Sequence, residues 1–203
     1  MKEQYFVKQS SKGYQTLNTS DMQFTDQRVI FFTGEVTEES TGDLISKLMF
    51  LDSLSDDPIT LILSSPGGSC YHGFAVIDLI GAMSSPVNTV CLGMCASMAS
   101  LLFTVGEKRY IFPNSRVMVH DAALSGIGGR LTAATLKEEI GQLQMMHDDI
   151  KELLKKRTQV NEEEAEKLLE GDSWLSADEA LKKGFATHII NNIGDLGLKT
   201  AFN

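Results

Sequence analysis

Two turns rich in small residues lie between residues 64 and 100 and form the most informative part of the chain. The first reads Ser64-Ser65-Pro66-Gly67-Gly68, and the second reads Gly93-Met94-Cys95-Ala96-Ser97-Met98-Ala99-Ser100. Each turn directly follows an apolar run that is typical of a buried strand. Such turns expose backbone N–H groups at a strand end, where they can stabilise a developing oxyanion. With a serine in the second turn, the chain is a candidate serine hydrolase.

Apolar runs and helical periods alternate around this stretch. Short apolar runs predict strands, whereas apolar residues at three- and four-residue steps predict helices. We expect strands at residues 28–34, 59–63, 87–92, 109–112, 116–120 and 185–190. We expect helices at residues 38–54, 71–83, 96–105, 132–157 and 161–170, and one more after Ser176. This alternation predicts an α/β layered domain.

Two segments differ from the rest of this pattern. Residues 1–27 are polar and lack clean periodicity, so they predict an N-terminal arm or loop before a single domain at residues 28–203. The helix over residues 132–157 would be roughly 39 Å long at 1.5 Å per residue. That length suggests a protruding helix for subunit contact, and a role in internal packing is the alternative.

Composition excludes several classes of function. The formal net charge of −9 argues against a nucleic-acid partner, because phosphate binding needs a basic surface. No apolar run is long enough for a membrane span, and no apolar leader follows Met1. The cysteines, Cys70, Cys91 and Cys95, lack the spacing of a metal site and predict reduced thiols in a cytoplasmic protein.

Three residues could form a catalytic triad, and each also has a plainer interpretation. Ser97 sits where a strand leads into a helix, so it is a candidate nucleophile or a helix N-cap. His120 ends an apolar strand and could be a general base or a hydrogen-bonded structural residue. Asp172 could orient that histidine or be a solvated turn residue. Gly67 and Gly68 could let a substrate approach the backbone, or could form a tight turn.

Five blocks in this order carry a family resemblance that covers residues 28–190. They are Arg28-Val29-Ile30-Phe31-Phe32-Thr33-Gly34, Ser65-Pro66-Gly67-Gly68, Ala96-Ser97-Met98, Pro113-Asn114-Ser115-Arg116-Val117-Met118-Val119-His120, and Asp172 with Leu175-Ser176-Ala177-Asp178-Glu179-Ala180. With these blocks the chain resembles the proteolytic subunits of the ATP-dependent Clp proteases. The resemblance implies a crotonase-like spiral of ββα units with a protruding handle helix at about residues 132–157.

The same resemblance implies a serine endopeptidase that hydrolyses unfolded polypeptides and short peptides without a cofactor or metal. Ser97 would be the nucleophile, His120 the base and Asp172 the orienting carboxylate. The N–H groups of Gly68 and Met98 would form the oxyanion hole. Substrate would bind at Gly67 and along the glycine-rich segment that contains Ser125, Gly126 and Ile127 by strand addition.

The resemblance also implies partners. Family members stack two rings of seven subunits around a closed chamber, and an AAA+ unfoldase feeds in the substrate chain. This chain is expected to form rings of seven, either single or stacked in pairs. Residues 1–27 would be the axial arm of such a ring. In the family, tyrosines of the unfoldase-docking clefts stand where this chain has Thr60 and Ile62, so docking is expected to differ.

Other departures from the family pattern leave alternatives open. Ala99 replaces a usual glycine, and Gly171 replaces an arginine that supports contact between rings. Asp121 follows His120 where the family has glutamine, and its charge could act on that histidine or merely face solvent. Ala99 and Gly171 motivate a second hypothesis, a structural or regulatory ring subunit that needs an active paralogue. A third hypothesis is a crotonase-fold acyl-CoA enzyme, which also uses paired backbone N–H groups.

Overall fold

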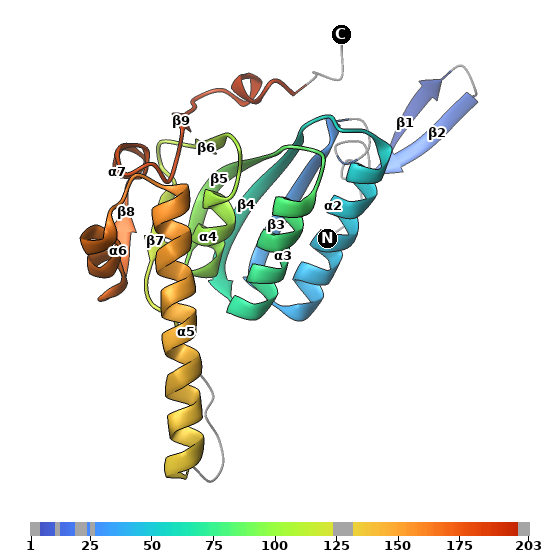
Figure 1. Ribbon diagram of the computed structural model, residues 1–203. Helices are drawn as coiled ribbons and strands as arrows, with labels where there is room; N and C mark the ends of the chain where they lie inside the picture. The colour runs from blue at the N-terminus through green and yellow to red at the C-terminus, as the bar shows by residue number, and fades with distance from the viewer. Residues whose placement is uncertain (1–4, 11–12, 19–23, 25–26, 124–131, 199–203) are drawn as a thin grey trace.

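The computed structural model describes residues 5–10, 13–18, 24, 27–123 and 132–198. Figure 1 shows an α/β structure in which α2, α3 and α4 cover one face of the sheet. The strands are β1 (Tyr5–Ser10), β2 (Gly13–Asn18), β3 (Val29–Val36), β4 (Ile59–Gly68), β5 (Val87–Ala96), β6 (Arg109–Ile111), β7 (Arg116–Val119), β8 (Ser173–Leu175) and β9 (His188–Ile189). The helices are α2 (Glu38–Leu54), α3 (Cys70–Ala82), α4 (Met98–Thr104), α5 (Ala133–Arg157), α6 (Glu162–Leu169), α7 (Ala177–Lys182) and the 3-10 helix η1 (Ile193–Leu196).

The main sheet is almost entirely parallel and divides at β5. Strands β3, β4, β5, β6 and β9 are adjacent in that order, and β7 pairs with both β5 and β8. The first part of β5 pairs with β6 at Thr89–Cys91, whereas its last part pairs with β7 at Met94–Ala96. Between them lies Gly93, whose φ of +83° favours glycine. This bend carries the end of β5 towards β7 and away from β6.

Four of the described α-helices begin with a capping box, in which the N-cap side chain accepts a hydrogen bond from a backbone amide three residues later, and the side chain of that later residue accepts one from the N-cap amide. The N-cap residues are Thr37 of α2, Thr132 of α5, Asn161 of α6 and Ser176 of α7. A side-chain oxygen at this position satisfies an amide that the helix itself leaves unpaired. In α6 and α7 the residues that reach back to the N-cap amide are Glu164 and Glu179. Gly184 follows α7 with a φ of +76°, a conformation that favours glycine after a helix.

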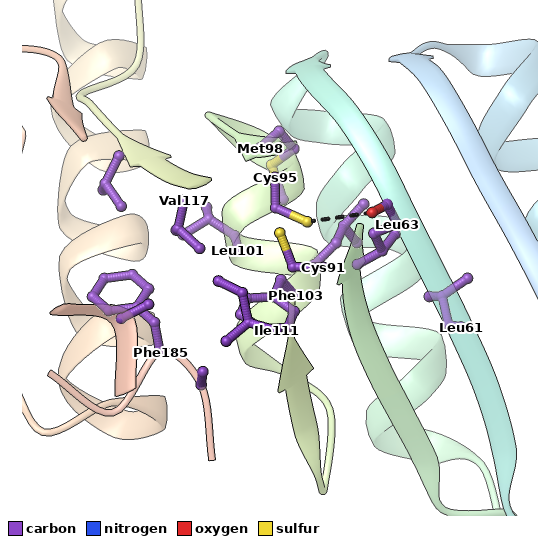
Figure 2. Close-up of a cluster of buried hydrophobic side chains, with 14 of the residues drawn as sticks. Leu61, Leu63, Cys91, Cys95, Met98, Leu101, Phe103, Ile111, Val117 and Phe185 are labelled. Carbon is purple, nitrogen blue, oxygen red and sulfur yellow. Dashed lines mark hydrogen bonds between the residues drawn. The ribbon is translucent and has the colours of Figure 1, made fainter. Parts of the chain in front are cut away.

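The core lies between the sheet and the helices that cover it. In α2, the side chains of Leu44, Leu48 and Leu51 are buried at helical spacing. Figure 2 shows how strands and α4 meet in the centre, where the Cys95 thiol lies 3.8 Å from the Leu63 carbonyl oxygen. The residues labelled there are Leu61, Leu63, Cys91, Cys95, Met98, Leu101, Phe103, Ile111, Val117 and Phe185. This packing holds the ends of β4, β5 and β7 in fixed positions.

Only the C-terminal part of α5 belongs to this core. Ile150 and Leu154 are buried, whereas Leu136, Ile140 and Met145, in the first half of the helix, are exposed. Figure 1 shows the N-terminal part of α5 extending beyond the rest of the molecule. The α/β fold and the protruding helix thus agree with the expectation from the sequence.

The structure corrects several predicted boundaries. No strand was expected within residues 1–27, but β1 and β2 form an antiparallel hairpin there. The Pro-Gly-Gly segment was expected as a turn, but it belongs to the end of β4, because Val36 of β3 pairs with Gly68. Strand β5 likewise extends to Ala96, and α4 begins only at Met98. The last strand is limited to His188–Ile189.

Candidate active site

The three candidate triad residues meet because β5 and β7 end, and β8 begins, at the same edge of the sheet. Strand β5 runs parallel to β7 with Ala96 opposite Met118, and the Ser97 amide donates to the Met118 carbonyl oxygen at 2.8 Å. Strand β8 runs antiparallel to β7 with Ser173 opposite Val119. The next pair in this register is His120 and Asp172. Strand register alone therefore places Ser97, His120 and Asp172 at the same edge of the sheet.

Ser97 has an unusual backbone at the junction of β5 and α4. Its φ is +52° and its ψ is −128°, and its side chain makes no cap bond to the helix. Non-glycine residues seldom occupy positive φ, and such strain collects at functional sites. The Ser97 Oγ instead lies 2.7 Å from the His120 Nε2. The N-cap interpretation of this side chain is therefore wrong.

His120 lies between the serine and the aspartate. Its Nδ1 is 3.3 Å from the Asp172 Oδ1. The imidazole is 32% exposed and the Asp172 side chain is 67% exposed, so the carboxylate stands at the rim and not in the interior. A proton on Nδ1 would leave the Nε2 lone pair directed at Ser97. This arrangement can draw a proton from the serine hydroxyl.

Gly67 allows β4 to press directly against the serine. A Cβ atom at this position would lie 2.7 Å from the Ser97 Cβ and 2.9 Å from the Met98 nitrogen. Gly68 is fixed from the other side, because its Cβ would lie 2.4 Å from the Val36 carbonyl oxygen. Met98 is the first residue of α4, so its N–H is one of the amides that have no partner within a helix. The backbone near Ser97 is thus closely approached by β4 and carries a helix N-terminal amide.

A small pocket opens beside these residues. Its lining includes Ser97, His120 and Asp121 together with the apolar side chains of Leu101, Val119 and Ile150. Cys70, Met98, Ser100 and Ala122 complete it. Sequence analysis did not single out Cys70, Val119 or Ile150 as lining this pocket, because they come from α3, β7 and α5 and share no motif.

Asp121 does not merely face solvent, which was one of the two alternatives. Its Oδ1 accepts a hydrogen bond from the Ala122 amide at 2.7 Å, and its Oδ2 lies 3.0 Å from the Nδ1 of His147.

A Cβ atom at Gly171 would meet no heavy atom within 4 Å, and Ala99 is fully buried. Ser125, Gly126 and Ile127, the expected substrate-binding residues, lie outside the described residues.

Comparison with known proteins decides the family. The family model described as Clp protease matches residues 11–193. The chain belongs to the Clp protease family. It is 35% identical over 181 residues to the "ATP-dependent Clp protease proteolytic subunit 1" of Chlamydia muridarum, which covers 87% of this chain and 93% of that protein. The protein of the same name from Chlamydia caviae is 36% identical over the same shares of the two chains.

Family membership makes the chain a peptidase with the fold of these subunits. It does not favour the acyl-CoA enzyme or the purely structural subunit. Within the described part of the chain, no cluster of three or more His, Cys, Asp or Glu side chains could hold a metal ion. The described helices include none with the length and hydropathy needed to span a bilayer.

Proposed function

We propose that the chain is a serine endopeptidase, the proteolytic subunit of an ATP-dependent Clp protease, with Ser97, His120 and Asp172 as its triad. The observation that carries this proposal is the contact series from Ser97 Oγ to His120 Nε2 at 2.7 Å and from His120 Nδ1 to Asp172 Oδ1 at 3.3 Å. Such a series provides a nucleophile, a base and an orienting group in the required order.

Hydrolysis would begin with transfer of the Ser97 hydroxyl proton to the Nε2 of His120. The serine oxygen bonds to the carbonyl carbon of the substrate, and the carbonyl oxygen becomes an oxyanion. Asp172 keeps the imidazole in the correct tautomer and stabilises its positive charge. His120 then returns the proton to the leaving amine as the peptide bond breaks. A water molecule repeats the sequence on the acyl-enzyme and regenerates Ser97.

The oxyanion would be bound by the N–H groups of Gly68 and Met98. The Met98 amide lies at the start of α4, where the helix dipole is positive. Gly67 supports this arrangement indirectly, because the absence of its side chain lets β4 approach Ser97 and Met98 closely. Ser125, Gly126 and Ile127 would pair with the substrate backbone.

Partner proteins would supply the energy for unfolding and would deliver the substrate to the active site. The relatives are named as subunits of an ATP-dependent protease, so we propose an AAA+ unfoldase that hydrolyses ATP and delivers unfolded polypeptide. The domain would assemble into rings of seven, singly or stacked in pairs, with the β1–β2 hairpin as an axial arm and α5 between rings. Three cysteines without disulfide bonds suit a reducing cytoplasm.

A peptidase assay tests this proposal. Purified wild-type protein and the Ser97→Ala variant are compared on a fluorogenic peptide, with native mass measured on both. Loss of hydrolysis in Ser97→Ala with unchanged assembly is expected, because the substitution removes only a hydroxyl. The control is Ser46→Ala, since this serine lies on the exposed face of α2 and bonds only the Gly42 carbonyl oxygen. Undiminished hydrolysis in Ser97→Ala would refute the mechanism.

A further inference from the structure

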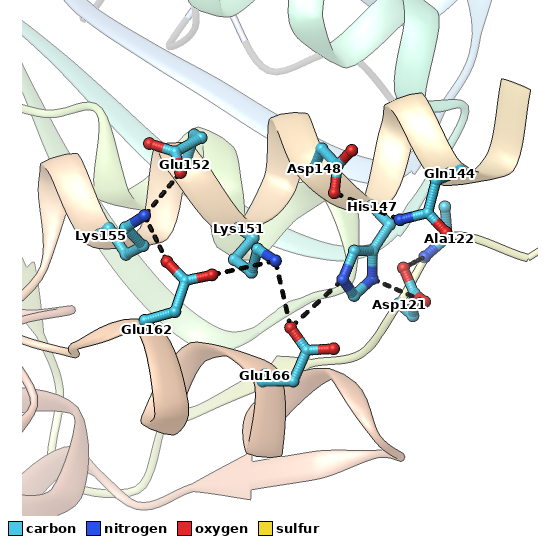
Figure 3. Close-up of polar contacts among 10 residues, drawn as sticks. All are labelled: Asp121, Ala122, Gln144, His147, Asp148, Lys151, Glu152, Lys155, Glu162 and Glu166. Atoms are coloured by element: carbon cyan, nitrogen blue, oxygen red, sulfur yellow. Dashed lines mark hydrogen bonds and ion pairs between the residues drawn. The ribbon is translucent and has the colours of Figure 1, made fainter.

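His147 of α5 lies between two carboxylates that come from different parts of the chain. Its Nδ1 is 3.0 Å from the Asp121 Oδ2, and its Nε2 is 3.4 Å from the Glu166 Oε2. The side chain is only 14% exposed. Figure 3 shows the imidazole ring between Asp121, in the segment that follows β7, and Glu166 of α6. Both ring nitrogens are thus directed at acceptors.

The two carboxylates belong to the segments that carry His120 and Asp172. Asp121 follows His120 directly, and its second oxygen is fixed by the Ala122 amide. Glu166 lies on α6, which ends at Leu169, three residues before Asp172. A bridge through His147 therefore connects the base and the orienting carboxylate of the candidate site to one helix.

This bridge needs a proton on each ring nitrogen. Ionised carboxylates only accept hydrogen bonds, and neutral imidazole has a single N–H. In the neutral ring one nitrogen lone pair would face a carboxylate oxygen, which is repulsive. Only the imidazolium form can satisfy Asp121 and Glu166 together.

The charged groups around the ring favour that form. Burial lowers the pKa of His147, but the hydrogen bonds and charges of Asp121 and Glu166 outweigh this and raise it above the usual 6.5. Lys151 on α5 opposes this, since its Nζ contacts Glu166 at 3.3 Å and Glu162 at 3.1 Å. On α3, Cys70 faces Asp121, and burial and that negative charge raise the pKa of its thiol, so it adds no charge.

We propose that protonated His147 is a positioning residue for the peptidase reaction, holding the segment after β7 and helix α6 at the spacing that keeps His120 between Ser97 and Asp172. This inference rests on the proposed function. The bridge is complete at pH values below the ordinary titration of histidine and is lost as pH rises through the raised pKa of His147. The catalytic rate should therefore fall on the alkaline side.

The test follows modification of Ser97 by a fluorophosphonate and hydrolysis of a fluorogenic peptide between about pH 6 and pH 9, a range that extends above the usual histidine titration because the pKa of His147 is raised. The wild type should lose about three- to tenfold in modification rate and kcat towards high pH, with KM unchanged, since small displacements of reacting groups cost large factors. His147→Gln should show the reduced rate at neutral pH and no alkaline fall. Lys155→Gln is the matched control, because Lys155 lies two turns further along α5 and contacts Glu152 and Glu162 instead.

Asp121→Asn provides a second, independent arm. Asparagine can still accept from Nδ1 but carries no charge, so the alkaline fall should move to lower pH. Circular dichroism and native mass show whether each variant has folded. If His147→Gln does not fold, the pH profile of Asp121→Asn decides the test. A wild-type profile in both His147→Gln and Asp121→Asn would overturn the inference. Absence of modification in the wild type at every pH would instead refute the proposed function.

Discussion

Gly67→Ala is a sensitive test of how β4 supports the nucleophile. The added methyl group would lie 2.7 Å from the Ser97 Cβ, 2.9 Å from the Met98 nitrogen and 2.6 Å from the Ala96 carbonyl oxygen, whereas ordinary contact begins at 3.4 Å. Ser97 or β4 must therefore move by about 0.7 Å or more to relieve the overlap. The φ of +95° at this position adds backbone strain of about 1–3 kcal/mol for alanine.

A displacement of this size acts on the reacting atoms themselves. Because a misplacement of about 1 Å can cost a hundredfold in rate, kcat for a fluorogenic peptide should fall on the order of fifty- to a hundredfold. The rate of Ser97 acylation should fall in parallel, since both depend on the same serine. Circular dichroism should show that the variant remains folded, because the rest of the core is untouched.

Gly81→Ala provides the control for this experiment. It makes the same substitution on an exposed part of α3, where no atom lies within 4 Å of the added Cβ. This variant should keep wild-type kcat. Wild-type kcat in a folded Gly67→Ala variant would refute the reasoning, because it would mean that Ser97 tolerates the displacement.

Three further substitutions give separate expectations. Asp172→Asn should lower kcat by roughly a hundredfold or more with little change in KM, because asparagine does not hold the required tautomer of His120. Steady-state kinetics measure both constants, and an unchanged kcat would contradict the role of Asp172 in orienting His120. Glu179→Gln should destabilise the protein above pH 4.5 and not in strong acid. Hydrogen bonds from the backbone and side chain of Ser176 lower the pKa of the Glu179 carboxyl, so its contribution to stability disappears as pH falls through that lowered pKa. Denaturation at several pH values tests this direction. Gly42→Ala should stabilise the protein by about 0.5–1 kcal/mol, since this helical glycine has free space for a methyl group; a lower denaturation midpoint would contradict that.

Helix boundaries were predictable where local chemistry decides them. The bounds of α2 agree with the sequence expectation, because apolar spacing and the cap at Thr37 act within a few residues. The hairpin of β1 and β2 was missed, since residues 5–18 show no clear alternation of apolar and polar side chains. The extension of β4 to Gly68 was missed as well, because pairing with Val36 overrides the usual behaviour of a Pro-Gly-Gly segment.

The candidate site was only partly accessible from the sequence. Ser97, His120 and Asp172 have weak individual signals, and the order of the surrounding blocks singled them out. Their meeting depends on the register of β5, β7 and β8, which no local pattern encodes. The bridge from Asp121 through His147 to Glu166 could not be predicted, because it joins residues that are 26 and 19 positions apart on three segments.

The most direct test of the central claim is to map the site of covalent labelling by a fluorophosphonate. Peptide hydrolysis and labelling are measured on the same sample of purified protein, and the modified residue is identified by peptide mass spectrometry. We expect a single adduct on Ser97, with hydrolysis lost in proportion to labelling. Full hydrolysis after Ser97 is labelled, or an adduct on another serine that abolishes hydrolysis, would contradict it.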